Sequence, residues 1–263
     1  MRETSPEVFL LARPSVDHDG MRAYLDAVGG GSWLAMRERE AAEGAVADAE
    51  LLAEFAGRIC YRSWQPGLNP NVTRIRTDRG EYFANVLRSS HGSVLEHASF
   101  SFAFRGVSRV FTHELVRHRA GSAFSQESLR YVRLTDIGFR VPPALEPIRG
   151  EVISLVERLE ELQVAAADTL GLDDDGVPFA VKKEITSALR RLAPIGLSTD
   201  ILWTANVRTL RHVIEMRTAP GAEEELRLVF DAVARIAQTE APNLFQDFSR
   251  ADDGSWVPEW RKV

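Results

Sequence analysis

The chain of 263 residues is 44% hydrophobic and 27% charged, which is ordinary for a soluble globular protein with a sizeable core. Its 32 Lys and Arg residues against 38 Asp and Glu residues give a formal charge of −6, which argues against a dedicated nucleic-acid or membrane-surface partner. Because Cys60 is the only cysteine, no disulfide can form within the chain, and we expect a reducing, cytoplasmic location.

The first half of the chain mixes short strands with helices. The run EVFLLA at 7–12 predicts a strand, and ASFSFAF at 98–104 predicts a half-buried strand because apolar and small residues alternate. Ser108 is a suitable N-cap for a helix over 108–118. Further helices are predicted over 21–28 (ended by glycines 29–31), 49–61 and 80–90, with a solvated helix or connector over 35–50.

The second half is richer in helix. Amphipathic patterns predict helices over 147–172, 179–192, 199–218 and 222–239. Strands mixed with runs of helices favour an α+β fold with several long helices. Since no stretch reads as a linker, we expect one domain over residues 1–263.

The densest polar cluster is Arg117-His118-Arg119, followed by Gly121 and several serines. It interrupts an apolar helical stretch, and a glycine lets the backbone approach a ligand closely. Arginine forks and hydroxyl groups suit a phosphate monoester, which accepts paired N–H donors. The alternative is a helix C-terminus whose cations complement the helix dipole, and the residue chemistry alone leaves both interpretations open.

A second cationic cluster surrounds 206–217. Arg208 and His212 are four residues apart and therefore share a helical face, while Arg217 lies near the predicted helix end. An exposed basic face is the simplest interpretation. However, the same stretch is rich in apolar side chains, so some of its arginines are expected to face a pocket or a partner.

The histidines do not form a metal-binding pattern. His113 and His118 are five residues apart, roughly 140° around a helix, whereas the zinc-protease motif needs a spacing of four. We therefore expect no metal. Taken alone, Cys60 in its apolar helix is predicted to be a small core residue. Nucleotide-loop, dinucleotide-fold and Ser-His-Asp signatures are absent from the sequence.

Together these clusters resemble the flavin-dependent thymidylate synthases, also called thymidylate synthase complementing proteins. That family carries Arg-His-Arg, seven residues, a Ser and then closely Arg-Tyr, which here reads RHRAGSAFSQESLRY at 117–131. Further similar motifs, in the expected order, are GRICYRSW at 57–64, HGSVLEH at 91–97, LRRLAP at 189–194 and WTANVRTLRHVIEMR at 203–217. The resemblance spans most of residues 50–245, and the first 45 or so residues contribute little to it.

The resemblance implies an antiparallel sheet within the α+β fold and a homotetramer with shared active sites. It implies FAD as cofactor, with NADPH and methylenetetrahydrofolate as co-substrates, and methylation at C5 of dUMP. Arg217 and Ser128 are the implied catalytic residues. The implied nucleotide-binding residues are Glu114, Arg117, Gln126, Ser128, Arg130, Arg190 and Arg217. The implied flavin-binding residues are Cys60, His91, Ser93, Glu96, Arg117, His118, Arg119, Asn206, Arg208 and His212.

Some positions depart from the family pattern. Eight residues, not seven, separate Arg119 from Ser128, which predicts a loop one residue longer over the nucleotide. Cys60 stands where the family often has a flavin-contacting Ser, Glu114 where some members have Gln, and Gly221 where some have His. Relatives in nucleoside-antibiotic pathways methylate UMP as well, so a UMP 5-methylase stays open. Two further alternatives are a flavoprotein oxidoreductase without methyl transfer and a non-catalytic nucleotide- or RNA-binding module.

Overall fold

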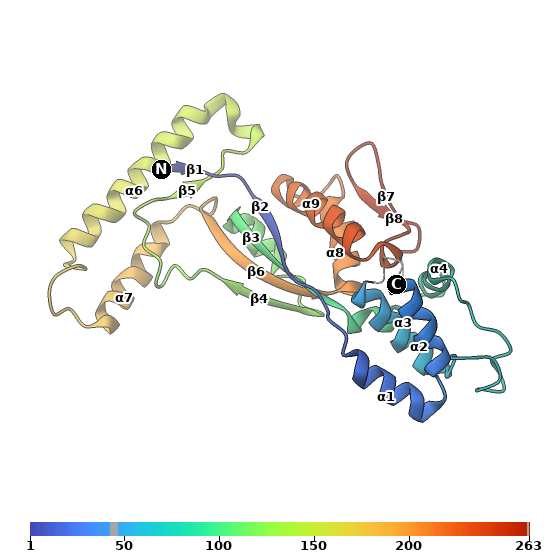
Figure 1. Cartoon of the computed structure of the whole chain (residues 1–263). Helices are drawn as coiled ribbons and strands as arrows, with labels where there is room; N and C mark the ends of the chain where they lie inside the picture. The colour runs from blue at the N-terminus through green and yellow to red at the C-terminus, as the bar shows by residue number, and fades with distance from the viewer. Residues whose placement is uncertain (43–46, 262) are drawn as a thin grey trace.

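The computed structural model describes residues 1–42, 47–261 and 263, and an antiparallel sheet lies at its centre (Figure 1). In spatial order the four strands are β2 (Glu7–Ala12), β3 (Ser99–Ser108), β6 (Ser198–Asn206) and β4 (Ser122–Gln126). Each neighbouring pair is antiparallel. The predicted α+β class with an antiparallel sheet and several long helices is confirmed.

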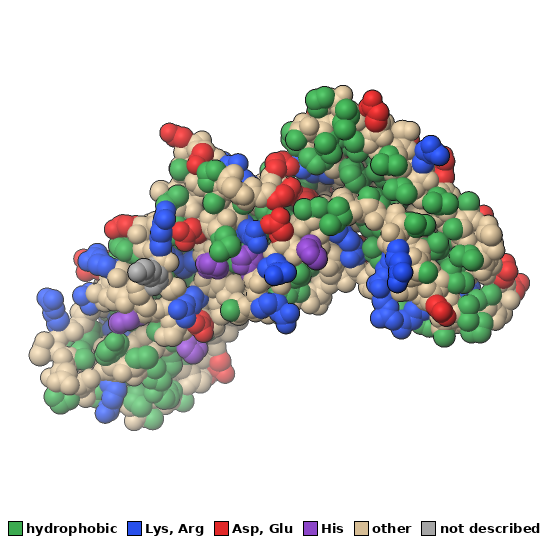
Figure 2. Space-filling view, turned by 180° about the vertical axis from the view of Figure 1, so that it is seen from behind, with side chains coloured by type: hydrophobic (Ala, Val, Ile, Leu, Met, Phe, Trp, Pro, Cys, Tyr) green, Lys and Arg blue, Asp and Glu red, His purple; other side chains and the backbone are tan. Residues whose placement is uncertain are grey.

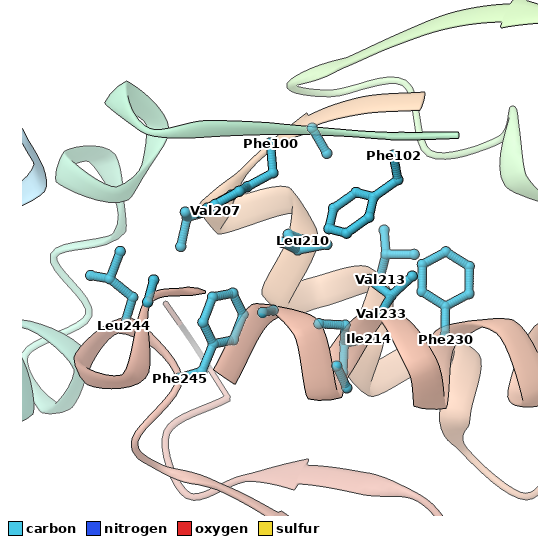
Figure 3. Packing of buried hydrophobic residues seen from close by; sticks show 14 of the residues in the cluster. Phe100, Phe102, Val207, Leu210, Val213, Ile214, Phe230, Val233, Leu244 and Phe245 are labelled. Carbon is cyan, nitrogen blue, oxygen red and sulfur yellow. The ribbon is translucent and has the colours of Figure 1, made fainter. Parts of the chain in front are cut away.

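The main core lies between one face of this sheet and two helices, α8 (Val207–Thr218) and α9 (Glu224–Glu240). Successive side chains of a strand point to opposite faces, so alternate residues of β3 and β6 are buried. Figure 3 shows the strand residues above the two helices. The labelled side chains are Phe100, Phe102, Val207, Leu210, Val213, Ile214, Phe230, Val233, Leu244 and Phe245. We call the sheet with α8 and α9 the sheet body.

A group of helices lies beside one end of the sheet (Figure 1). They are α1 (His18–Val28), α2 (Gly31–Ala42), α3 (Asp48–Tyr61) and α4 (Arg79–Arg88). Their own small core contains Trp33 and Trp64. The buried Glu54 carboxylate accepts hydrogen bonds from the Trp33 indole (3.0 Å), from Arg37 (2.7 Å) and from Arg58 (2.7 Å). This paired charge network ties α2 to α3.

A lobe projects from the opposite end of the sheet (Figure 1). It consists of β1 (Arg2–Glu3) paired in parallel with β5 (Gly138–Phe139), η2 (Pro143–Ile148), α6 (Arg149–Thr169), α7 (Phe179–Leu189) and η3 (Arg190–Leu192). Its core cluster is small and includes Ile137, Phe139 and Val156. We call this part the helical lobe.

The remaining elements lie around α8. They are η1 (Gly92–His97), α5 (Arg109–Leu115), η4 (Pro242–Leu244), β7 (Phe248–Arg250) and β8 (Trp256–Pro258). The two strands form a hairpin, and β8 contacts α8. The end of the chain returns to α8, where Arg208 Nε donates to the Val263 carbonyl (3.3 Å), and the C-terminal label in Figure 1 lies beside α3 and α4.

Most local predictions are confirmed. The strand at 7–12 has the predicted bounds, and Ser108 caps α5 by accepting a hydrogen bond from the Phe111 amide. Helix α1 ends at Gly29, whose φ of 76° is the left-handed conformation that glycine favours. The helix or connector expected over 35–50 is helical to Ala42, and residues 43–46 lie outside the described part of the chain.

Three predictions are wrong. The first half of the helix predicted over 199–218 is strand β6, where Thr199, Ile201 and Trp203 face the core with a period of two. The presumed loop after Arg119 contains strand β4, which pairs with β6. Cys60 is exposed rather than buried, because it lies in the last turn of α3, away from the face that packs inward. No described helix has the length and apolar character needed to cross a membrane.

Candidate active site

Two chain segments come together where β6 ends and α8 begins. One is 117–121, which follows α5, and the other is the first turn of α8 after its cap residue Asn206. The backbone N–H of Asn206 donates to the Gly121 carbonyl (3.0 Å), and the Thr209 hydroxyl donates to the Ala120 carbonyl (2.7 Å). Gly121 has φ = 65°, and a Cβ there would lie 2.4 Å from Asn206 Nδ2. This close approach requires glycine.

These segments form two walls of a cavity of about 620 Å³. Seven of the ten predicted flavin-binding residues line it: Glu96, Arg117, His118, Arg119, Asn206, Arg208 and His212. Figure 2 shows histidine, lysine and arginine side chains gathered over the middle of the molecule on its rear face. The two polar clusters seen in the sequence therefore meet in space.

The arginines of α8 lie on different faces of the helix and therefore have different surroundings. Arg208 faces the cavity, where its Nη1 donates to Glu96 Oε1 (2.5 Å). Arg211 is buried at the edge of the cavity, and its guanidinium forms two hydrogen bonds of 2.8 Å with the Asp247 carboxylate. The prediction that some of these arginines face a pocket is therefore confirmed for Arg208, whereas Arg211 holds the C-terminal segment against α8.

Arg217 is held by residues of the neighbouring segment. Its Nη1 lies 2.6 Å from Glu114 Oε2, and its Nε donates to His118 Nε2 (2.8 Å). His118 must therefore be neutral at Nε2 to accept this bond. Burial, then the nearby charges of Arg217 and His212, lower the pKa of His118 from 6.5 to about 4. These contacts fix the plane of the Arg217 guanidinium.

Other predicted residues lie apart from this cavity. Arg130 and Arg190 line a second depression of about 490 Å³ on the helical lobe, with Lys183 and Arg191. Ser128 lies two residues before Arg130 in the chain, and its hydroxyl accepts a hydrogen bond from the Arg130 backbone amide (3.3 Å). In Figure 2 a second group of Lys and Arg side chains lies on the lobe. A single chain does not bring these lobe residues into the cavity.

Four further predicted site residues line neither depression, and the same holds for Glu114, Ser128 and Arg217. Gln126 donates from Nε2 to the Thr112 hydroxyl (3.0 Å). His91 stacks on Tyr61, with ring centroids 6.2 Å apart. Ser93 lies in η1, and the Cys60 thiol donates to the Ala56 carbonyl (3.4 Å). None of the four lines the cavity, and their proposed roles stay predictions.

The sequence predictions missed several residues that line the cavity. They are Ala120, Thr209, Arg211, Glu215, Phe248, Pro258, Trp260, Arg261 and Val263. Five of them, from Phe248 onward, come from the C-terminal segment, which carried no motif. Only the return of the chain to α8 places these residues beside the cationic ones.

The residues present fit an anionic flavin nucleotide. Arginines face the cavity from 117–119 and from α8, and guanidinium forks pair well with phosphate oxygens. Gly92 adds room beside Arg208, because a Cβ there would lie 2.8 Å from Arg208 Nε. Among the described residues, no group of three or more His, Cys, Asp and Glu side chains is arranged to hold a metal ion.

The fold and this cavity define a class: an α+β protein with a cationic cavity, suited to an anionic ligand, between the end of its sheet and a helix N-terminus. Residues 44–243 match the family described as thymidylate synthase complementing protein. The chain belongs to this family of enzymes, which confirms the resemblance found in the sequence.

Curated relatives cover most of the chain. A flavin-dependent thymidylate synthase of Mycobacteroides abscessus is 40% identical over 223 residues, which is 78% of this chain and 83% of the relative. Those of Mycolicibacterium gilvum and Mycobacterium avium are each 38% identical, over 75% and 78% of this chain and 78% and 83% of their own lengths.

Proposed function

We propose that this chain catalyses the FAD-dependent methylation of C5 of a uridine 5′-monophosphate, by default dUMP to dTMP. Methylenetetrahydrofolate is the carbon donor, and NADPH reduces the flavin. The cavity is the observation that carries this proposal, because it gathers seven of the ten residues expected to bind flavin. The names of the relatives, flavin-dependent thymidylate synthases, support the same reaction. A nucleotide-forming enzyme of this kind belongs in the cytoplasm.

The chain's own residues divide the remaining work. When bound, reduced flavin supplies a hydride, so the reaction does not require an enzyme thiolate. Arg119 and Arg208 line the cavity, and we assign them the phosphate oxygens of the flavin nucleotide. Arg217 is fixed by Glu114 and His118 and can stabilise negative charge that develops on a uracil oxygen. A preorganised donor is effective because it needs no reorientation during the reaction.

We propose that the active site is completed between copies of the chain in a homotetramer. Arg130 and Arg190, expected to bind the nucleotide phosphate, line the depression on the helical lobe and not the cavity. Phe179 on that lobe is 70% exposed, and Leu155 is 61% exposed. Apolar side chains in such positions favour burial against a partner. A second copy that covers the lobe would bring its own cavity toward these arginines.

The test is a tritium-release assay with C5-labelled dUMP and UMP run side by side. Release that depends on methylenetetrahydrofolate and reduced flavin is expected with dUMP. Release with UMP alone would identify the ribonucleotide as substrate. Flavin reduction without release from either nucleotide would favour a simple oxidoreductase, and a colourless protein without turnover would favour a binding module. Either of the last two results overturns the proposal.

A further inference from the structure

One wall of the cavity comes from the end of the chain, after β8. Pro258, Trp260 and Arg261 line the cavity, and we call them the C-terminal wall. They lie beyond residues 44–243, which match the family. This wall is therefore a feature of this chain that the family match does not account for.

The C-terminal wall is held firmly in place. The backbone amides of Glu259 and Trp260 donate to the carbonyl and the carboxylate of Asp247, at 3.0 and 3.3 Å. The Asp247 carboxylate is buried and paired with Arg211. Arg88 lies over the Trp260 ring, with its guanidinium carbon 5.6 Å from the ring centroid. The indole is thus fixed before any ligand arrives.

Trp260 differs from the other four tryptophans. Trp33, Trp64, Trp203 and Trp256 are each 5% exposed or less, whereas Trp260 is half-buried and borders the cavity. A cavity that offers guanidinium groups from one side and an indole from another matches a ligand that carries both phosphate and a planar ring. Stacking on an aromatic side chain is the common way to hold such a ring.

We propose that Trp260 stacks on a planar ring of the flavin nucleotide bound in this cavity. This inference rests on the proposed function, since it takes the flavin to be the occupant. The residue would then contribute to affinity and would limit the orientation of the ring, while the arginines hold the phosphates.

The experiment compares flavin binding by four forms of the full chain freed of flavin: wild type, Trp260→Ala, Trp260→Phe and Trp256→Phe. Trp256→Phe is the matched control, because Trp256 is buried in β8 and does not line the cavity. Dissociation constants for FAD and for FMN are measured by equilibrium dialysis, with thermal unfolding of each flavin-free protein beside them. The emission of the bound flavin is the second readout, because indole in contact with a flavin quenches its emission and phenyl does not.

We expect Trp260→Ala to weaken FAD binding on the order of 5- to 100-fold. Trp260→Phe should keep most of the affinity but bind a more emissive flavin, and Trp256→Phe should change neither readout. Weaker binding of FAD and FMN alike would identify the isoalloxazine as the stacked ring. Weaker binding of FAD alone would identify the adenine.

Unchanged affinity in Trp260→Ala together with unchanged emission in Trp260→Phe would overturn the stacking. If Trp260→Ala fails to fold, Trp260→Leu takes its place in both the affinity and the emission measurements. A wild-type chain that binds no flavin would overturn the proposed function, and the inference with it, which keeps the two failures distinct.

Discussion

The sheet body and the helical lobe use amphipathic helices in different ways. In the sheet body, Phe104, Trp203 and Phe230 are completely buried between the sheet and the helices. In the lobe, no side chain of α7 is fully buried within the described chain, and Phe179 is 70% exposed. Similar sequence patterns thus lead to a closed core in one region and to an open apolar surface in the other. The pattern of apolar residues indicates which face of a helix is apolar. Whether that face is covered depends on what packs against it, another part of the chain or another copy.

The largest expected effect concerns the closed core. Phe230→Ala should lower the free energy of unfolding by about 3–5 kcal/mol, because it leaves a cavity between β3, β6 and α8. Leu228→Ala is the matched control, since this residue lies on the same helix and is half exposed. It should change stability by no more than about 0.5 kcal/mol. Chemical denaturation measures both, and equal losses would contradict the described core.

The second prediction compares arginines of the two regions. Arg217→Ala should reduce the rate of methyl transfer at saturating nucleotide by roughly 100- to 1,000-fold, about 2.7–4 kcal/mol, because a fixed charge is lost. Arg130→Ala on the lobe should instead raise KM for the nucleotide with a smaller change in kcat. Single-turnover flavin reoxidation separates these effects. A wild-type rate for Arg217→Ala at high dUMP would show that Arg217 only binds substrate.

The third prediction concerns the open surface of the lobe. If another copy covers it, Phe179→Ser should weaken self-association on the order of tenfold or more, since buried aromatic anchors dominate interfaces. The control is Glu157→Ser, an exposed charged residue on α6. Sedimentation equilibrium measures the association. An unchanged oligomeric state in Phe179→Ser would mean that the lobe surface is not an interface.

The smallest expected effect concerns the protonation of His118. The pKa of His118 in the folded chain is about 4, against 6.5 for an ordinary histidine. As the pH falls from about 6.5 to 4, the unfolded chain binds this proton and the folded chain does not, so His118 lowers the stability of the fold over this range. NMR of labelled histidine, with His118→Gln to assign the signal, measures the titration. Arg217→Gln should raise this pKa, and titration near 6.5 in the wild type would disprove the contact.

The sequence predicted the helices of both regions well, because their apolar residues recur at helical spacing. It failed at 199–206, where a strand with a period of two runs directly into α8 with only the cap residue Asn206 to mark the boundary. It also missed β4, a short and mostly polar strand whose existence depends on pairing with β6. For a related reason, the sequence did not predict that Trp260 and the rest of the C-terminal wall line the cavity. Such placements come from contacts between distant segments, which no local pattern encodes.

Strand β4 restricts how the segment between Arg119 and Ser128 can change in length. Ser122 pairs with Ala205 and Gln126 with Ile201, so an insertion within the strand would exchange its two faces from that point on. Gly121 is equally constrained by its contact with Asn206. We therefore expect insertions and deletions to be tolerated only after Gln126. Such a change would displace the lobe residues and leave both walls of the cavity in register.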